Sequence, residues 1–285
     1  MTDFSSFLIA SDLDGTFFAD GAKIVARNLD AIARFTAGGG MFTFATGRVQ
    51  LNIYRRIPNP TALLSAPAVM CNGAYLYDFT TKTALFEEFL PESAAREILA
   101  FAKQHLPDVA FRVAAPNTLR IENIADPYLA RDVQGYLPES VRIAPAETWQ
   151  TDDWYKIVFR ADAARSIEVR RLLEAQFAGR LSVIPSDPTI MEVQRPDTDK
   201  ATGIAKLRRY LGEQTRTVIT CGDFENDIPM HRAADVAVAP ANALPTVKEI
   251  CDLVLCSNNE GLIADVIEAI EAGRILPHKH KGETL

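Results

Sequence analysis

The sequence predicts an α/β protein whose core is a doubly wound, Rossmann-like parallel sheet with an inserted α+β cap domain. Near both ends of the 285-residue chain, short apolar runs typical of buried strands alternate with segments of helical spacing. Between these regions the pattern changes to helices and paired short strands. Polar residues directly follow several of the apolar runs, and in parallel sheets ligands gather at the carboxyl ends of the strands.

The first elements alternate strand and helix. The run Phe7–Ser11 is apolar throughout, as in a buried strand, and residues 25–36 show helical spacing. Three glycines at 38–40 end that helix, as is common at helix C-termini. A strand at 41–45, a helix at 49–56 and a strand at 68–71 follow. Because strands joined by helices pair in parallel, this order favours a doubly wound sheet.

The middle of the chain departs from this alternation. Segments 74–77 and 84–89 flank a turn-like stretch and predict a hairpin. Helices are expected at 91–105, 127–137 and 163–177, and strands at 110–114, 119–121, 141–144, 155–160, 181–184 and 190–193. Alternation resumes with a helix from 199, strands at 217–221 and 236–239, and helices from 227 and at 260–272, before a polar tail at 277–285 that is expected to be disordered. We therefore expect a core from residues 1–81 and 189–285, with 82–188 inserted as the α+β domain.

Composition limits the class of protein. Hydrophobic residues make up 48% of the chain and charged residues 24%, an ordinary globular balance, and the formal net charge is −7. That charge argues against a nucleic-acid-binding protein, which usually carries a basic face. No apolar run approaches the ~20 residues of a membrane span, and no signal-peptide pattern opens the chain. The four cysteines form no Cys-x-x-Cys pair, so a reducing, cytoplasmic location is expected.

An acidic turn directly follows the first expected strand. In Asp12-Leu13-Asp14-Gly15-Thr16, residues two apart on an extended segment point the same way, so Asp12 and Asp14 can face one site. Two such carboxylates repel each other unless a cation or a shared proton compensates them. A hard divalent ion is the natural compensation, and Mg²⁺ fits best. The alternative is a surface turn, because Asp and Gly are common turn formers.

A second acidic group follows the expected strand at 217–221. Residues 222–227 read GDFEND, which again places acids at the carboxyl end of a buried strand. Asn226 or Asp227 could cap the next helix. Capping explains one polar residue, but the segment holds three acids and an amide within five positions. The mutual repulsion of these acids again indicates a nearby cation.

Two further segments suit a phosphate group. Thr46 and Gly47, at the end of the second strand, combine a hydroxyl with a glycine that lets the backbone approach an anion. The alternative for Thr46 is an ordinary helix cap. Lys200 lies in the first turn of a helix that Thr198 or Asp199 would cap. A cation there opposes the helix dipole by about 0.3–1 kcal/mol, and a bound phosphate would turn the position into an advantage.

Together and in this order, the four segments resemble those of the haloacid dehalogenase superfamily of phosphohydrolases, over nearly the whole chain. The insert between Thr46 and Lys200, preceded by CNGA at 71–74, is similar to the C2-capped, Cof-type branch. The segments PANA at 240–243 and SNNEG at 257–261 also match that branch. The chain departs from the family pattern around Lys200 and at 239–241, beside the expected site. The resemblance implies that the insert is a substrate-specificity cap.

The resemblance also implies roles for individual residues. Asp12 is expected to be the nucleophile and a metal ligand, and Asp14 the general acid/base, which also binds the metal through its backbone carbonyl. Asp223 is implied as a metal ligand, and Asp227 as a support for the metal site or for Lys200. Phosphate binding is implied for Leu13, Thr46, Gly47, Lys200 and Asn226. The basic residues Arg112, Arg120 and Lys156 lie on or near expected strands of the insert and are candidates for substrate contacts, but most such charges are expected to be solvated by default.

The implied function is Mg²⁺-dependent hydrolysis of a small phosphorylated metabolite, such as a sugar phosphate or a phosphorylated cofactor, through an aspartyl-phosphate. One alternative is a sugar phosphomutase of the same superfamily, which would use the same intermediate but return the phosphate to a sugar. The other is a receiver-like signalling module that keeps its phospho-aspartate. Receivers are much shorter, however, and lack both the inserted domain and an acid two residues after the nucleophile.

Overall fold

The structure, a computed structural model, describes residues 2–212 and 216–277. The chain forms two compact units. The first comprises Met1–Thr46, Asn59–Leu85 and Asp199–Leu285, and the second comprises Gly47–Pro58 and Phe86–Thr198. The second unit thus contains a short early segment, 47–58, that the sequence-based boundaries assign to the core. The tail expected to be disordered lies outside the described residues from 278 onward.

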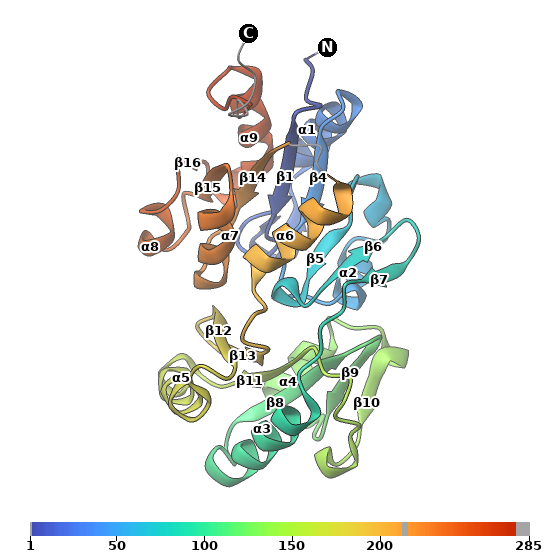
Figure 1. The fold of residues 1–285 in the computed structure, drawn as a ribbon, viewed down its shortest axis with the longest axis vertical. Coiled ribbons are helices and arrows are strands. Elements are labelled where there is room, and N and C mark those ends of the chain that lie inside the picture. The colour runs from blue at the N-terminus through green and yellow to red at the C-terminus, as the bar shows by residue number, and fades with distance from the viewer. Residues whose placement is uncertain (1, 213–215, 278–285) are drawn as a thin grey trace. The chain divides into compact units, whose positions relative to one another are not determined.

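The first unit is built around a five-stranded parallel sheet. Its strand order is β16-β15-β14-β1-β4, and all four neighbouring pairs run in parallel (Figure 1). The strands are β1 (Phe7–Ser11), β4 (Met41–Phe44), β14 (Thr217–Cys221), β15 (Val236–Pro240) and β16 (Leu253–Leu255). This arrangement confirms the predicted α/β class with a parallel central sheet. The edge strand β16 was not among the predicted strands.

Helices complete the first unit. They are α1 (Ala26–Ala37), α6 (Lys200–Leu211), α7 (Ile228–Ala233), α8 (Pro245–Lys248) and α9 (Leu262–Glu271). Helix α1 packs against α9, and α6 packs against α7. In Figure 1, α6 and α7 lie on the near side of the sheet. Every residue of β1 is buried, which explains its continuous apolar run, and Leu8 packs in one cluster with Ile204 and Leu207 of α6.

The third predicted strand pairs differently from expectation. Strand β5 (Ala68–Met70) forms a separate antiparallel sheet with β6 (Tyr75–Asp78) and β7 (Thr83–Leu85). The expected hairpin is present as β6 and β7. Strand β5 adjoins the main sheet through one parallel bridge, between Ala45 and Val69. A second small hairpin joins β2 (Phe18–Ala19) to β3 (Lys23–Ile24).

The second unit is an α+β layer structure. Its six-stranded sheet has the order β10-β9-β8-β11-β13-β12, which is antiparallel except between β9 and β10. The strands are β8 (Ala110–Ala115), β9 (Thr118–Ile121), β10 (Val141–Ile143), β11 (Lys156–Arg160), β12 (Ser182–Asp187) and β13 (Ile190–Gln194). The helices are α2 (Gln50–Arg56), α3 (Glu92–His105), α4 (Pro127–Val133) and α5 (Ala163–Phe177). One apolar cluster joins residues of α3 and α5 to the sheet.

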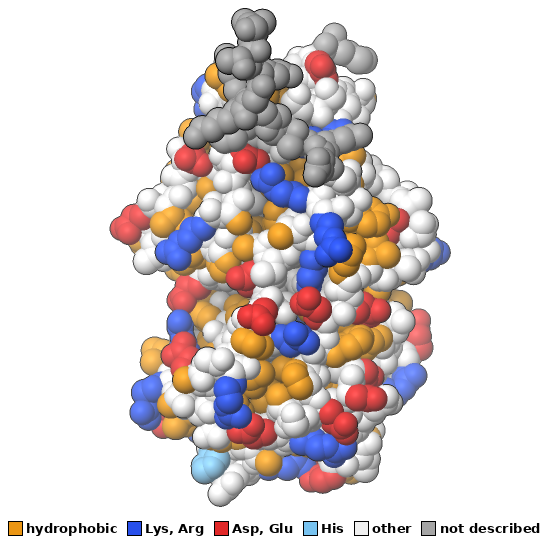
Figure 2. Space-filling view, viewed as in Figure 1, with side chains coloured by type: hydrophobic (Ala, Val, Ile, Leu, Met, Phe, Trp, Pro, Cys, Tyr) orange, Lys and Arg blue, Asp and Glu red, His pale blue; other side chains and the backbone are white. Residues whose placement is uncertain are grey.

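The three basic residues of this sheet are paired with acids. The ion pairs are Arg112 with Asp132, Arg120 with Asp153 and Lys156 with Glu192, each at 2.6 Å. The expectation that such charges are solvated is wrong for Lys156, which is 2% exposed. On the face drawn in Figure 2, acidic and basic side chains are interspersed. Among the described residues, no helix is long and apolar enough to cross a bilayer.

Candidate active site

Three neighbouring strands bring the predicted polar residues to one edge of the sheet. Strands β14, β1 and β4 lie side by side and run in parallel, so their carboxyl ends meet. Asp12 directly follows β1, Thr46 follows β4, and Asp223 follows β14. The Asp12 N–H donates to the Cys221 carbonyl at 2.8 Å, which extends the β1–β14 pairing to the first of these residues. The topology therefore assembles segments that are far apart in the sequence.

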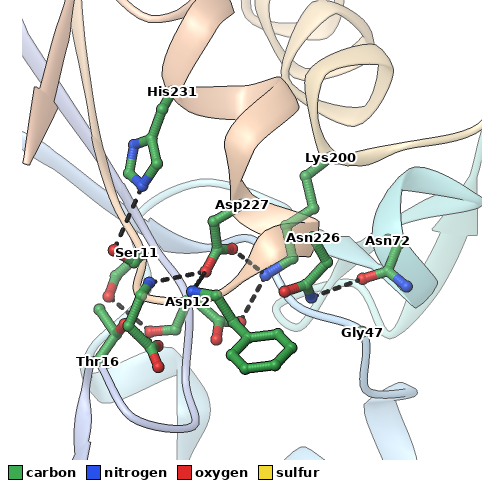
Figure 3. A network of polar contacts seen from close by, with 12 residues as sticks. Ser11, Asp12, Thr16, Gly47, Asn72, Lys200, Asn226, Asp227 and His231 are labelled. Carbon is green, nitrogen blue, oxygen red and sulfur yellow. Dashed lines mark hydrogen bonds and ion pairs between the residues drawn. The ribbon is translucent and has the colours of Figure 1, made fainter. Parts of the chain in front are cut away.

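Lys200 joins two of these segments through its side chain. Its ammonium donates to Asp12 Oδ1 at 2.7 Å and to Asp227 Oδ1 at 2.6 Å (Figure 3). Lys200 is fully buried, and Asp227 is equally buried. A buried ammonium is stable only where anionic partners satisfy it. The carboxylates of Asp12 and Asp227 meet this requirement. The hydrogen bond from Lys200 in turn fixes the orientation of the Asp12 side chain.

The start of α6 is shaped to deliver Lys200 to this place. Asp199 caps the helix by accepting from the Thr202 N–H at 2.8 Å, and Thr202 Oγ1 accepts from the Asp199 N–H at 3.0 Å. Of the two caps that the sequence allowed, the structure therefore uses Asp199. Gly73 has φ +94°, and a Cβ there would lie 2.0 Å from the Asp199 carbonyl oxygen. The close approach of this turn to the helix start thus requires glycine.

Asp227 closes the acidic turn instead of capping the following helix. Its Oδ2 accepts from the N–H groups of Asp223 at 2.8 Å and of Phe224 at 3.1 Å. Its side chain makes no capping hydrogen bond to α7. Asp223 in turn accepts from Thr16 Oγ1 at 2.7 Å. The two acidic segments of the sequence are therefore held together by direct contacts.

Crowded carboxylates and burial set the electrostatics of the site. Burial raises the pKa of Asp12 to about 7, although the attraction of Lys200 opposes the shift. Burial also raises the pKa of Asp223 to about 8, with added repulsion from Asp227 and Asp12. Burial alone would lower the pKa of Lys200, but the carboxylates of Asp12 and Asp227 outweigh it and raise that pKa. The site therefore holds more negative charge than the single ammonium of Lys200 balances.

These acids fit a divalent cation. Carboxylate oxygens of Asp12, Asp223 and Asp227 lie within 4.8 Å of one another, and oxygen ligands of this kind suit Mg²⁺. A cation would also offset the excess negative charge that this crowding creates. Asp14 is exposed, and its charge contributes to the raised pKa of Asp12. The predicted contact of Asp14 with the metal uses its backbone carbonyl, so its carboxyl group is not needed among the ligands.

Two of the predicted phosphate-binding residues, Thr46 and Asn226, are joined to each other through Asn72. Thr46 is buried and lies at the end of β4, and its carbonyl accepts from the Asn72 N–H at 3.0 Å. Asn226 Nδ2 donates to Asn72 Oδ1 at 3.3 Å (Figure 3). Asn226 Oδ1 is buried and finds no hydrogen-bond partner among the described residues. The side chain of Leu13 is also buried, in keeping with a role confined to its backbone.

Three neighbouring residues were not identified from the sequence as part of the site. Asn72 links Thr46 to Asn226, Thr16 holds Asp223, and Asn242 donates to the Gly15 carbonyl at 2.8 Å. All three belong to motif segments of the sequence, at 12–16, 71–74 and 240–243, but none of them received a role. Their position directly after strands, or within the first acidic turn, was the available signal.

Similarity to known proteins agrees with this geometry. A family model for haloacid dehalogenase-like hydrolases matches residues 9–267. The pyridoxal phosphate phosphatase YbhA of Escherichia coli (strain K12) is 26% identical, over 91% of this chain and 97% of its own length. The 5-amino-6-(5-phospho-D-ribitylamino)uracil phosphatase YcsE of Bacillus subtilis (strain 168) is also 26% identical, over 91% of this chain and 94% of its own. A haloacid dehalogenase-like hydrolase from Bacteroides thetaiotaomicron has a similar structure, with a TM-score of 0.79, 26% identity and coverage of 93% and 99%.

Proposed function

Because the chain belongs to the haloacid dehalogenase-like hydrolase family and is similar to the phosphatases YbhA and YcsE, we propose that it hydrolyses a small phosphorylated metabolite with Mg²⁺, through an aspartyl-phosphate on Asp12. The observation that carries the proposal is the contact of Lys200 with both Asp12 and Asp227, beside Asp223. This arrangement fixes the buried carboxylate of Asp12 for attack on phosphorus, and it places the positive charge of Lys200 beside that carboxylate, where it can stabilise the phosphate oxygens.

In the first step, an oxygen of the Asp12 carboxylate attacks phosphorus in line with the ester bond. The bond between phosphorus and the ester oxygen breaks, and Asp14 gives its proton to the leaving oxygen. Asp14 is exposed, so its carboxyl group is accessible to a substrate. Lys200, the Leu13 N–H, the Thr46–Gly47 turn and Asn226 hold the phosphate oxygens.

In the second step, a water molecule attacks phosphorus of the aspartyl-phosphate. Asp14, now ionised, takes a proton from that water, and the bond to Asp12 breaks. Inorganic phosphate leaves and both carboxyl groups return to their starting states. Asp14 thus serves as acid and then as base, which is why an acid two residues after the nucleophile separates this chemistry from dehalogenation.

We assign the metal to carboxylates of Asp12 and Asp223 and the Asp14 backbone carbonyl, with Asp227 in support. When bound, Mg²⁺ reduces the repulsion between the carboxylates and an anionic substrate. The chain itself must keep Asp12 ionised although burial raises its pKa. Lys200 favours the ionised form through its charge and its hydrogen bond.

The relatives narrow the substrate class. One is named for pyridoxal phosphate and another for a phosphoribityl-aminouracil, and both substrates are phosphate monoesters that carry a nitrogen heterocycle. We therefore place phosphorylated cofactors and their precursors first among substrates to test, followed by sugar phosphates. Assays should score free phosphate against a rearranged sugar phosphate, because the rearranged product would indicate a mutase.

The decisive test is Asp12→Asn. The variant keeps the size of the side chain and an acceptor for Lys200, so it should fold, but an amide cannot act as the nucleophile. We expect Mg²⁺-dependent release of phosphate from p-nitrophenyl phosphate to fall to background, with an unchanged circular dichroism spectrum. If the variant retained most of its activity, the proposed mechanism would be wrong.

A further inference from the structure

A lysine of the second unit holds the backbone beside the predicted phosphate-binding threonine. Lys156 Nζ donates to the Gly47 carbonyl at 2.5 Å and to Glu192 Oε1 at 2.6 Å. Lys156 is 2% exposed and Glu192 is 4% exposed, so the ion pair is almost completely removed from water. Lys156 lies at the start of β11, and Glu192 lies on the neighbouring strand β13. The sheet therefore sets the position of the ammonium.

The carbonyl that Lys156 contacts lies at a boundary of the fold. Thr46 belongs to the first unit, whereas Gly47 and the following residues to 58 belong to the second. Two more buried amides fasten this segment within the second unit. Gln50 donates to Asn117 Oδ1 at 2.9 Å, and Asn52 donates to the Gly135 carbonyl at 2.7 Å. The turn after Thr46 is thus anchored by the second unit from its first residue onward.

Stability alone is a poor explanation for this ion pair. Desolvation of two charges costs several kcal/mol, and apolar side chains of similar volume often serve a fold equally well or better. A buried ion pair is better explained where one of its charges holds another group of the protein in place. Here the ammonium also contacts a main-chain carbonyl, and that carbonyl belongs to the residue directly after Thr46.

We propose that Lys156 is a positioning residue for the phosphate-binding turn, with Glu192 holding its ammonium against the Gly47 carbonyl. In a trans peptide the carbonyl and the N–H point in opposite directions. With the Gly47 carbonyl turned toward Lys156, the Arg48 N–H points away from it. Anion-binding turns present N–H groups to the anion, and a carbonyl oxygen in their place repels it. Lys156 therefore prevents this peptide from turning over. The inference rests on the proposed function, because it takes Thr46 and Gly47 as phosphate-binding.

The test removes the ion pair without leaving one charge buried alone. Two double variants do so: Lys156→Met with Glu192→Leu, and Lys156→Met with Glu192→Gln. For a folded variant we expect kcat/KM on p-nitrophenyl phosphate to fall by about 10²-fold, as a small misplacement of a binding group can cause. The inhibition constant for inorganic phosphate should rise as well, because the same turn would bind that product.

A matched control removes another ion pair from the same sheet. Arg120 pairs with Asp153 at 2.6 Å and also donates to the Gln150 carbonyl, so its hydrogen bonds stay within 150–153. Arg120→Met with Asp153→Asn should change kcat/KM and phosphate inhibition by less than about threefold, even if its melting temperature falls. This control separates a loss of stability from a loss of position.

The possible outcomes are distinct. A folded pair-removal variant with wild-type kcat/KM and phosphate inhibition would overturn the inference while leaving the proposed function intact. Failure of both pair-removal variants to fold would also overturn it, because the pair would then serve stability. A wild-type protein that releases no phosphate from any ester would instead refute the proposed function. Lys156→Arg with Glu192 intact keeps the charge and several donors. If the contact with the Gly47 carbonyl is what matters, this variant should keep a higher kcat/KM than the two pair-removal variants.

Discussion

Gly15 shows how tightly the site is packed around one residue. It has φ +73°, and a Cβ there would lie 2.3 Å from Asp223 Oδ2 and 2.9 Å from Oδ1. Both atoms belong to a carboxylate that Thr16 fixes through a hydrogen bond. Glycine is therefore required at position 15 for two separate reasons: its left-handed backbone and the close approach of Asp223, a proposed metal ligand.

Gly15→Ala should displace Asp223 and lose most Mg²⁺-dependent phosphatase activity, with a weaker affinity for Mg²⁺ in an activation curve. The matched control is Gly21→Ala, because Gly21 has φ +72° and a Cβ added there would meet no atom within 4 Å. Both variants carry the same backbone strain, about 1 kcal/mol, so both should melt at a lower temperature. Equal activity of the two variants would show that Asp223 tolerates the displacement.

Residues of the site differ in how far the sequence reveals them. Asp12 and Asp223 directly follow apolar strands, so their meeting at one edge follows from parallel pairing alone. Asn72 could not be given a role in this way. Its contact with Asn226 joins residues 154 positions apart and depends on a left-handed turn with φ +50°. Asn tolerates a left-handed backbone, so the local sequence permits this turn, but the partner of Asn72 is set by the tertiary fold.

The N-terminus of α6 is an element whose stability and function can be separated. Asp199 forms a reciprocal capping box with Thr202, and the next residue is Lys200. The N-terminus of α5 offers a comparison within the same chain, because Asp162 caps it by accepting from the Arg165 N–H at 2.9 Å. Asp162 is exposed and lies in the second unit.

Removing either cap should cost stability, but only one removal should cost activity. Asp199→Ala and Asp162→Ala should each lower the free energy of unfolding by about 1 kcal/mol, the usual value of such a cap. Asp199→Ala should also reduce kcat, because fraying at the first turn loosens the ammonium of Lys200 from Asp12. Denaturant titration and steady-state kinetics on both variants check this prediction. A wild-type kcat for Asp199→Ala would show that the two carboxylates hold Lys200 without help from the cap.

At the level of elements, the sequence identifies strands better than their partners. The apolar run at 68–71 is a strand, but β5 pairs with β6 in a small antiparallel sheet. A tight turn at Cys71–Gly73 brings β6 back against one side of β5, while β5 adjoins β4 of the main sheet through the bridge between Ala45 and Val69. Strand β16 was missed because it is only three residues long and its middle residue is exposed. Short edge strands lack the continuous apolar run that marks a buried one.

The whole molecule is acidic, and buried acids gather at the proposed metal site. The formal net charge is −7, and burial raises the pKa values of Asp12 and Asp223 to about 7 and about 8. An unfolded chain would release these protons near pH 4. Between pH 4 and pH 8 these two acids therefore hold more protons in the metal-free folded protein than in the unfolded chain, and burial of His231, which lowers its pKa, opposes this effect by at most one proton. The free energy of unfolding of the metal-free protein should fall as the pH rises through this window, because these acids contribute stability only while they are protonated.

A divalent cation should reverse this loss, and the size of the reversal should depend on pH. Mg²⁺ competes with protons for the same oxygens, so it should bind more weakly at pH 5.5 than at pH 8. At a free Mg²⁺ concentration 100 times its dissociation constant, the folded state gains about 2.7 kcal/mol. That gain corresponds to roughly 5–10 °C in melting temperature. Thermal unfolding with EDTA and with Mg²⁺, at both pH values, measures the difference directly.

The variant Asp223→Asn tests whether this acidic cluster causes both the pH dependence of stability and the gain from Mg²⁺. The amide can still accept from Thr16 but carries no titrating proton, so the metal-free variant should lose less stability between pH 5.5 and pH 8 than the wild type. Its gain from Mg²⁺ should be small at both pH values, because one ligand charge is absent. Asp265, a partly buried acid elsewhere in the first unit, should not contribute to this loss of stability between pH 5.5 and pH 8. Burial acts to raise the pKa of Asp265, but hydrogen bonds from Cys256 and Arg27 to its ionised form lower that pKa overall. It is therefore already ionised across the window. If wild type and variant responded equally to pH and to Mg²⁺, the cluster of Asp12, Asp223 and Asp227 would not be the metal site.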